Sequence, residues 1–246
     1  MQHKTQGIVL NVARYNDRFS IVHIFTRDFG RVSYLLPKTT GKRSKMKTAL
    51  FFPLSLLNLE TEHLPLRELQ RLEDAEQAFP LHDLCTSVSK VATAIFLSEF
   101  LSRVLRETNE NPQLYEFLHH SIILLETTDK GFANFHLAFM AGLTRFLGIF
   151  PNTQNYTAGA YFDLLNGEFT PNVPFHTHYL SKQQSLYLCH FRRINYHNMQ
   201  LFRLSQANRN AIIDFLLTYY RLHTYDFPPL KSLDVLREVM GGEKRN

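Results

Sequence analysis

The sequence contains little cysteine and no long apolar run. Only Cys85 and Cys189 occur among 246 residues, so no disulfide framework is possible and a reducing compartment is indicated. We expect Cys85, at the start of a helix among apolar residues, to lie in the core. The first apolar run, at residues 8–10, is too short for a signal peptide. No run approaches the roughly 18 apolar residues of a membrane span. These absences predict a cytoplasmic protein with no membrane segment.

The common catalytic motifs are also missing. A phosphate-binding Walker loop needs Gly, four residues, then Gly-Lys-Ser/Thr. Here Gly41-Lys42 is followed by Arg43, and Leu36 occupies the leading glycine position. There is no Gly-x-Ser-x-Gly elbow and no His-Glu-x-x-His motif. We therefore expect no catalytic residues, no cofactor and no enzymatic activity. A nuclease or phosphodiesterase is the weakest alternative, because the sequence shows no cluster of metal-binding carboxylates or histidines.

One stretch does gather possible metal ligands. It contains His176, His178, Cys189, His190 and His197. Zinc sites use ligand pairs at short, fixed spacings, and these residues do not show that spacing. The sequence therefore predicts no metal site here.

Positive charge is concentrated in the first 47 residues. Ten Lys/Arg and two Asp give this part a charge of +8, whereas the whole chain carries only +5. Five of the cations lie in the segment 38–47, which contains no acid: Lys38, Lys42, Arg43, Lys45 and Lys47. Such asymmetry suggests that the N-terminal part faces a polyanion.

The first 80 residues show the pattern of strands. Apolar and β-branched residues alternate with turn signals, predicting strands over Gly7–Tyr15, Phe19–Thr26, Val32–Leu36, Leu50–Leu59 and Leu66–Leu72. Pro53 places an edge or a bulge in the fourth of these. Five strands before any helical period favour a five-stranded oligonucleotide-binding (OB) barrel.

Helical periodicity begins after Phe79-Pro80. It predicts helices from about Val88 to Val104, from Pro112, through Phe135–Phe146, after Ser181, over Asn208–Leu222 and from Ser232. An irregular, aromatic-rich insert without cysteine occupies about 151–178. The predicted class is α+β, with an OB barrel at 1–79 and a helical domain at 80–246.

Basic and aromatic residues of the barrel predict a DNA-binding surface. Arg14, Arg18, Arg27 and Arg31 lie at strand ends or turns, and the segment 38–47 follows them. A cationic groove with aromatic stacking platforms is how OB folds bind single strands. The candidate stacking residues are Tyr15, Phe19, Phe25 and Tyr34, although half the side chains of an alternating strand face the core.

Several short motifs, in order, resemble the bacterial recombination mediator family RecO. They are Gly7-Ile8-Val9-Leu10, Tyr15-Asn16-Asp17-Arg18, Phe25-Thr26-Arg27-Asp28-Phe29-Gly30, Leu147-Gly148-Ile149-Phe150-Pro151 and Pro229-Leu230-Lys231-Ser232-Leu233. The resemblance covers essentially the whole chain. It implies binding of single- and double-stranded DNA, annealing of complementary strands, and loading of RecA onto strands covered by single-strand binding protein (SSB).

The resemblance also implies partners and one departure. RecR and SSB are the family's partners, and the protein would be nucleoid-associated. For the acidic SSB tail we expect a hydrophobic groove rimmed by Arg145, Arg192 and Arg193. Many members carry a four-cysteine zinc cluster in the insert, which this sequence lacks, so zinc is not carried over. The alternative to a mediator is a protein-binding adaptor whose basic segment only adds solubility.

Overall fold

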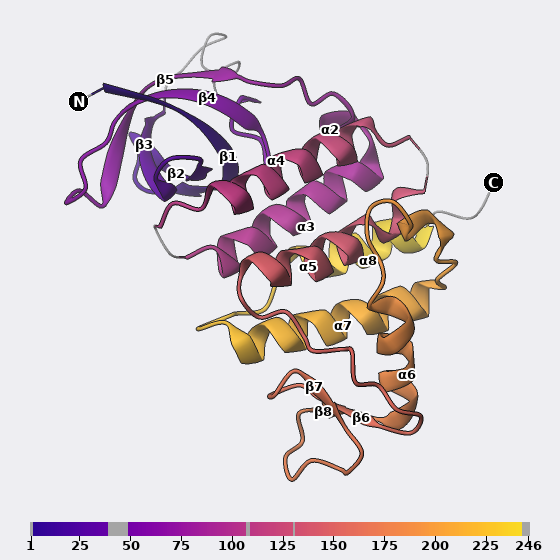
Figure 1. Cartoon of the computed structure of the whole chain (residues 1–246). Helices are drawn as coiled ribbons and strands as arrows, with labels where there is room; N and C mark the ends of the chain where they lie inside the picture. The colour runs from indigo at the N-terminus through magenta and orange to yellow at the C-terminus, as the bar shows by residue number, and fades with distance from the viewer. Residues whose placement is uncertain (1, 39–48, 107–108, 130, 243–246) are drawn as a thin grey trace. The chain divides into compact units, whose positions relative to one another are not determined.

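The structure, a computed structural model, describes residues 2–38, 49–106, 109–129 and 131–242 (Figure 1). Its contacts divide the chain into two compact units. Unit 1 comprises Met1–Thr127 and Pro228–Asn246, and unit 2 comprises Thr128–Phe227. Unit 1 therefore includes residues from both sides of the strand-to-helix change near residue 79.

The N-terminal strands form a closed barrel. The strands are β1 (Gln2–Arg14), β2 (Phe19–Thr26), β3 (Gly30–Pro37), β4 (Leu56–Glu62) and β5 (Leu69–Gln77). Their order around the barrel is β1-β2-β3-β5-β4, and β3 and β5 run parallel while the other pairs are antiparallel. A five-stranded barrel with helices after it confirms the predicted fold class.

Only β2 has its predicted limits: β1 begins five residues early, at Gln2, β3 extends over Gly30–Pro37, and both ends of β4 and β5 are shifted toward the C-terminus. Strand β4 begins at Leu56 rather than Leu50, because the chain turns at Pro53 and Leu54, where Leu54 takes a left-handed φ of 65°. Strand β5 continues to Gln77, five residues beyond the predicted end, because Gln77 pairs with Leu57 of β4. Barrel pairing here overrides the weak strand propensity of the acidic residues in β5.

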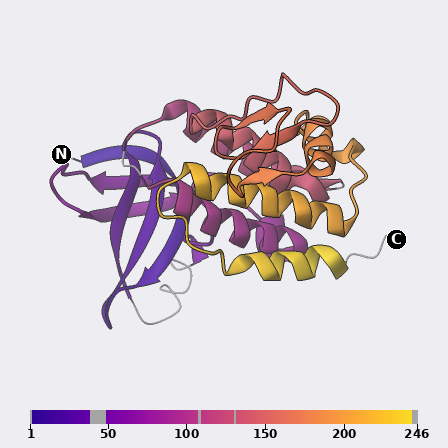
Figure 2. The same ribbon diagram turned by 90° about the horizontal axis from the view of Figure 1, so that it is seen from below.

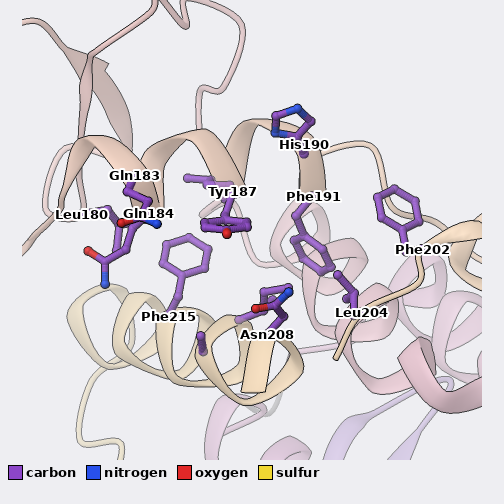
Figure 3. A pocket seen from close by; sticks show the side chains of 13 residues that line it. Leu180, Gln183, Gln184, Tyr187, His190, Phe191, Phe202, Leu204, Asn208 and Phe215 are labelled. Carbon is purple, nitrogen blue, oxygen red and sulfur yellow. The ribbon is translucent and has the colours of Figure 1, made fainter. Parts of the chain in front are cut away.

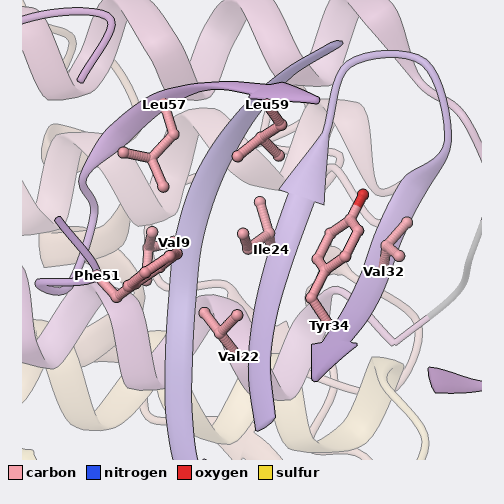
Figure 4. Packing of buried hydrophobic residues seen from close by; sticks show 8 residues of the cluster. All are labelled: Val9, Val22, Ile24, Val32, Tyr34, Phe51, Leu57 and Leu59. Atoms are coloured by element: carbon pink, nitrogen blue, oxygen red, sulfur yellow. The ribbon is translucent and has the colours of Figure 1, made fainter. Parts of the chain in front are cut away.

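The barrel interior is filled by alternating side chains (Figure 4). The buried cluster consists of Val9, Val22, Ile24, Val32, Tyr34, Phe51, Leu57 and Leu59. Gly7 lies where β1 pairs with both neighbours, and a Cβ at this position would come within 2.5 Å of Ile24 Cγ2. Only glycine lets these strands approach so closely.

A bulge in β1 attaches the barrel to helix α3 (Val88–Val104). The register with β2 shifts between Val9 and Asn11, so the carbonyl of Leu10 leaves the strand ladder. The hydroxyls of Ser98 and Ser102, one turn apart on α3, donate to this carbonyl. The otherwise orphaned backbone oxygen thus fixes α3 against the barrel.

The short helix α2 (Asp83–Thr86) precedes α3 and corrects one expectation. Cys85 is exposed rather than in the core, because Leu84 takes the buried position of this single turn.

Helices α4 (Pro112–Thr127) and α8 (Ser232–Gly242) complete unit 1. Asn111 Oδ1 accepts from the backbone N–H of Leu114, as predicted for a cap before an N1 proline. Helix α8 lies beside α3, although more than a hundred residues separate them in the chain (Figure 2). Glu99 of α3 accepts hydrogen bonds from Lys231 N (3.1 Å) and Ser232 N (2.8 Å) and so caps α8.

Unit 2 contains η1 (Phe132–Asn134), α5 (Phe135–Phe146), α6 (Lys182–Phe191), η2 (Met199–Leu201) and α7 (Gln206–His223). The helix predicted after Ser181 is α6, and the structure shows that Ser181 caps it in a reciprocal arrangement with Gln184. Tyr220 of α7 donates to the carbonyl of Met140 on α5 (2.7 Å), which satisfies a fully buried hydroxyl.

The insert is more regular than predicted. It forms a three-stranded antiparallel sheet of β6 (Tyr161–Asp163), β7 (Glu168–Thr170) and β8 (Tyr179–Leu180) in the order β7-β6-β8. Asp163 accepts from Leu165 N and Asn166 N, which closes the β6–β7 turn, and from the ring of His176 in the β7–β8 connection. Apolar packing attaches the sheet to α6 and α7 through Phe162, Leu164, Leu180, Leu188 and Tyr219.

Candidate nucleic-acid interface

Three of the predicted DNA-binding cations meet at one end of the barrel. The tip of the β1–β2 hairpin is built by Asn16, whose side-chain oxygen accepts from Arg18 N (2.9 Å) and Phe19 N (2.8 Å). The end of β3 lies beside this tip, because Lys38 N donates to Arg18 O (2.8 Å) and Lys38 Nζ to Asn16 O. We call this region the hairpin-end surface; it comprises Arg14, Tyr15, Arg18, Phe19 and Lys38.

The cations of the hairpin-end surface are available to an anion. Arg14, Arg18 and Lys38 are all exposed. Arg14 pairs with Asp17 at 3.0 Å, with side chains 78% and 93% exposed, so the pair contributes little stability and is easily exchanged for a phosphate. Within the described part of the chain, the Arg18 side chain has no hydrogen bond or ion pair. Lys42, Arg43, Lys45 and Lys47 follow Lys38 in the sequence and lie outside the described residues.

Arg27 and Arg31 are placed differently. They lie at the other end of the β2–β3 pair, and both contact helices of unit 1. Arg27 pairs with Glu116 of α4 at 3.0 Å. Arg31 donates to the carbonyls of Ser102 and Leu105 at the end of α3, both at 2.9 Å. A cation at a helix C-terminus is favourable, so Arg31 has a structural task. Burial, followed by the nearby Arg106 and Arg103, lowers the pKa of Arg31.

The four candidate stacking aromatics also fall into two groups, one on the surface and one in the core. Tyr15 is exposed and Phe19 is half-buried, both on the hairpin-end surface. Tyr34 is fully buried in the barrel core, and burial raises its pKa to about 12. Phe25 is also buried, with its ring stacked on Tyr115 of α4 at 6.5 Å between centroids. A ring face inside a packed core cannot stack on a base, so Phe25 and Tyr34 are withdrawn as stacking candidates.

Unit 2 contains an apolar groove between α6 and α7 (Figure 3). The α6–α7 groove has a volume of about 220 Å³ and is lined by Leu180, Tyr187, Leu188, Phe191, Phe202, Leu204, Ile212, Phe215 and a few polar residues. Sequence reasoning did not identify these residues, since each also fits an ordinary helix core. The structure separates them by exposure, since Tyr187 lines the groove and yet is 52% exposed.

The three predicted rim arginines do not line the α6–α7 groove. Arg192 and exposed Arg193 directly follow Phe191, which does line it. The Arg192 guanidinium donates to the carbonyl of Thr153 in the insert. Arg145 of α5 lies over the ring of Phe150, 4.8 Å from its centroid.

The stretch that gathers possible metal ligands is held by other contacts. His176 bonds to Asp163 (3.2 Å), and His190 Nδ1 lies 2.7 Å from the carbonyl of Leu186. His178 and His197 are exposed, and Cys189 is half-buried. Within the described ranges, the one group of three or more His, Cys, Asp or Glu side chains close enough to share an ion lies elsewhere, on α4.

The closed five-stranded barrel followed by helices defines an OB-barrel protein with a helical remainder. Residues 1–80 match the family described as Recombination protein O N terminal, and residues 85–234 match Recombination protein O C terminal. The chain therefore belongs to the Recombination protein O (RecO) family, and this membership gives it a role in DNA repair and recombination.

Curated relatives agree over nearly the whole length. The chain is 43% identical over 239 residues to the DNA repair protein RecO of Phocaeicola vulgatus, covering 97% of this chain and 99% of the relative. It is 42% identical over 240 residues to the DNA repair protein RecO of Bacteroides fragilis, with the same coverage. It is 31% identical over 241 residues to that of Flavobacterium psychrophilum, again with the same coverage. In the described part of the chain, no helix is long and apolar enough to cross a membrane.

Proposed function

We propose that this protein is a non-catalytic recombination mediator that binds single- and double-stranded DNA, anneals complementary strands and helps to load RecA onto SSB-covered strands. RecR and SSB are its proposed partners, and its proposed location is the cytoplasm, on the nucleoid. The observation that carries the proposal is the gathering of exposed Arg14, Arg18 and Lys38 at one end of an OB barrel, where the chain enters its most basic segment.

The proposed DNA contact consists of the hairpin-end surface and the basic residues that follow it. Arg14, Arg18 and Lys38 bind phosphates, together with Lys42, Arg43, Lys45 and Lys47 of the adjoining segment. Phosphate contacts supply affinity without reading sequence. Tyr15 and Phe19 offer ring surface to unpaired bases. Arg27 takes part only if a phosphate replaces Glu116, because the two side chains are paired at 3.0 Å.

Annealing follows from the same charge. Two DNA strands repel each other, and a cationic surface that holds one strand lowers the cost of approach for the second. The basic segment provides this screening without ordering the bases, so the bases stay free to pair.

The SSB tail is proposed to dock on unit 2. The tail is acidic and ends in an apolar residue, so it requires an apolar slot with cations nearby. The α6–α7 groove supplies the slot, and Arg192 and Arg193 directly follow its lining residue Phe191. Arg145 remains the third proposed rim residue.

Binding of fluorescent single-stranded DNA across a salt series tests the proposal. Replacing Lys42, Arg43, Lys45 and Lys47 by Ala should weaken binding to all sequences alike. Each lost contact removes about 0.7 from the slope of log K against log salt for single strands, so losing two or three lowers it by about 1.5–2. Annealing should fall in parallel.

The alternative function, a protein-binding adaptor, gives the opposite result. In that case the same variant melts normally and keeps its affinity and its salt slope. A metal-dependent cleavage assay on labelled DNA, in which the intact chain should leave the strand uncut, tests the absence of nuclease activity.

A further inference from the structure

Helix α4 presents two histidines and a glutamate on one face. Glu116, His119 and His120 stand at positions i, i+3 and i+4, which share a face of an α-helix. One potential ligand atom from each lies within 4.8 Å of the other two. The three side chains are half-buried or exposed, so an ion can reach them from solvent.

Two of these three side chains are held in place by the barrel. The ring of Tyr115, which is 1% exposed, stacks on Phe25 of β2 and on His119, with centroids 6.5 Å and 6.0 Å apart. Glu116 is oriented by Arg27, which binds its Oε1 at 3.0 Å. The second oxygen, Oε2, faces the His120 ring, 3.8 Å from Nδ1. Arg27 thus gives Glu116 the charged, hydrogen-bonded partner that commonly stands behind a metal-binding carboxylate.

We propose that Glu116, His119 and His120 bind a divalent transition metal of the zinc class. Two imidazole nitrogens and one carboxylate oxygen form the three-ligand set of open zinc sites, in which water takes the fourth position. Oxygen-preferring Mg²⁺ and Ca²⁺ are disfavoured by the two histidines. Glu116 contributes Oε2 and keeps Arg27 on Oε1.

The ligands need only a small movement. At zinc bond lengths of about 2.1 Å, tetrahedral ligand atoms lie roughly 3.4 Å apart, so separations of up to 4.8 Å must close by up to about 1.4 Å. The His120 side chain is 75% exposed, so solvent rather than packed protein surrounds most of its ring. Its Nδ1 lies 2.7 Å from the carbonyl of Glu116, which can only accept, so Nδ1 carries the proton and Nε2 keeps a lone pair for the metal.

The site is distinct from a structural zinc cluster. Helix α4 is capped by Asn111 and packed through buried Leu114, Tyr115 and Leu118, contacts that need no metal ligand, so the metal adds to a helix that these contacts already hold. We therefore expect reversible binding that chelator dialysis removes.

Calorimetric titration of Zn²⁺ into the full chain, after chelator dialysis, tests the assignment. We expect about one equivalent to bind, and His120→Gln, His119→Gln and Glu116→Gln to weaken binding more than tenfold each, since even outer-shell changes cost 10–100-fold. His178→Ala is the matched control, because His178 is also exposed and lies beside His176 (6.3 Å between ring centroids). This control should bind zinc as the parent does.

Three results would overturn the proposal. One is the absence of binding at millimolar zinc, and another is parental affinity in His120→Gln. The third is loss of binding in His178→Ala, which would assign the metal to the insert. If His119→Gln melts early, His120→Gln still decides, because the His120 side chain is 75% exposed and meets the His119 ring by an edge contact, with centroids 5.8 Å apart. A Co²⁺ absorption spectrum that changes with His120→Gln and not with His178→Ala would give independent support.

Discussion

Arg18 and Arg31 provide a direct test of which barrel arginines contact DNA. Both follow a turn of the barrel, and sequence reasoning assigned both to DNA. The structure places them in different surroundings, since Arg18 is exposed on the hairpin-end surface and Arg31 bonds to the end of α3. Replacing each by Ala should therefore separate stability from DNA binding.

The expected stability losses follow from the contacts. Arg31→Ala removes two hydrogen bonds of 2.9 Å from a charged donor to helix-terminal carbonyls. Hydrogen bonds to charged groups contribute about 1.5–3 kcal/mol, and water can replace part of this at a half-buried site. We expect a loss of about 2–3 kcal/mol, equivalent to about 4–12 °C in melting temperature. Arg18→Ala, at an exposed turn, should stay within about 0.5 kcal/mol.

DNA binding should show the reverse order. Measured well below the melting temperature, Arg18→Ala should lower the salt slope for single strands by about 0.7, the value of one phosphate contact. Arg31→Ala should leave that slope unchanged. Arg221→Ala, an exposed arginine of unit 2, is the control that should change neither quantity. If Arg31→Ala melts like the parent and flattens the slope, the assignment of these two arginines is wrong.

Three further predictions concern the barrel, α8 and the insert. Gly7→Ala should destabilise by about 1–3 kcal/mol through overpacking against Ile24, as measured by denaturant unfolding; an unchanged midpoint would contradict the close approach. Burial alone would raise the pKa of Glu99, but the hydrogen bonds from Ser232 and Lys231 outweigh burial and lower that pKa. Ionised Glu99 therefore stabilises the folded state above the unfolded pKa of about 4.3, and this stabilisation is lost as pH falls through the folded pKa. Glu99→Gln should therefore cost about 1–2 kcal/mol at pH 7 and little at pH 3, and an equal cost at both would refute the assignment. In the His120→Gln variant, which lacks the proposed α4 site, chelator dialysis should leave the melting temperature unchanged, because Asp163 and the aromatic cluster hold the insert; a lowered melting temperature in that variant would reveal a structural metal in the insert.

Local signals predicted much of the fold. Strand β2 has its predicted limits because Asn16-Asp17 and Asp28-Phe29-Gly30 place turns on both sides of it. Helix α6 begins after Ser181 because Ser181 and Gln184, which cap each other, lie within four residues of the sequence. The end of β5 was not predictable in this way, since it depends on pairing with Leu57 of β4 across the barrel.

The candidate site was predictable only in part, because residue types do not reveal distant partners. Arg18 and Arg31 look alike in the sequence, and what separates them is Ser102, which is 71 residues away from Arg31. Phe19 and Phe25 differ in the same way, since Tyr115 covers only Phe25. The Glu-x-x-His-His spacing on α4 is visible in the sequence, but only the structure shows that the three side chains approach one another.

The pairing of α3 with α8 has a consequence for synthesis on the ribosome. Helix α3 ends at Val104, and its neighbour begins only at Ser232, about 130 residues later. At 5–20 residues per second, the nascent chain waits roughly 6–26 s before α8 can cover that side of α3. Unit 2, which is continuous in sequence, emerges entirely within this interval. Unit 2 can therefore finish folding first. Until α8 is made, the apolar side of α3 that α8 will cover remains exposed and can be bound by chaperones.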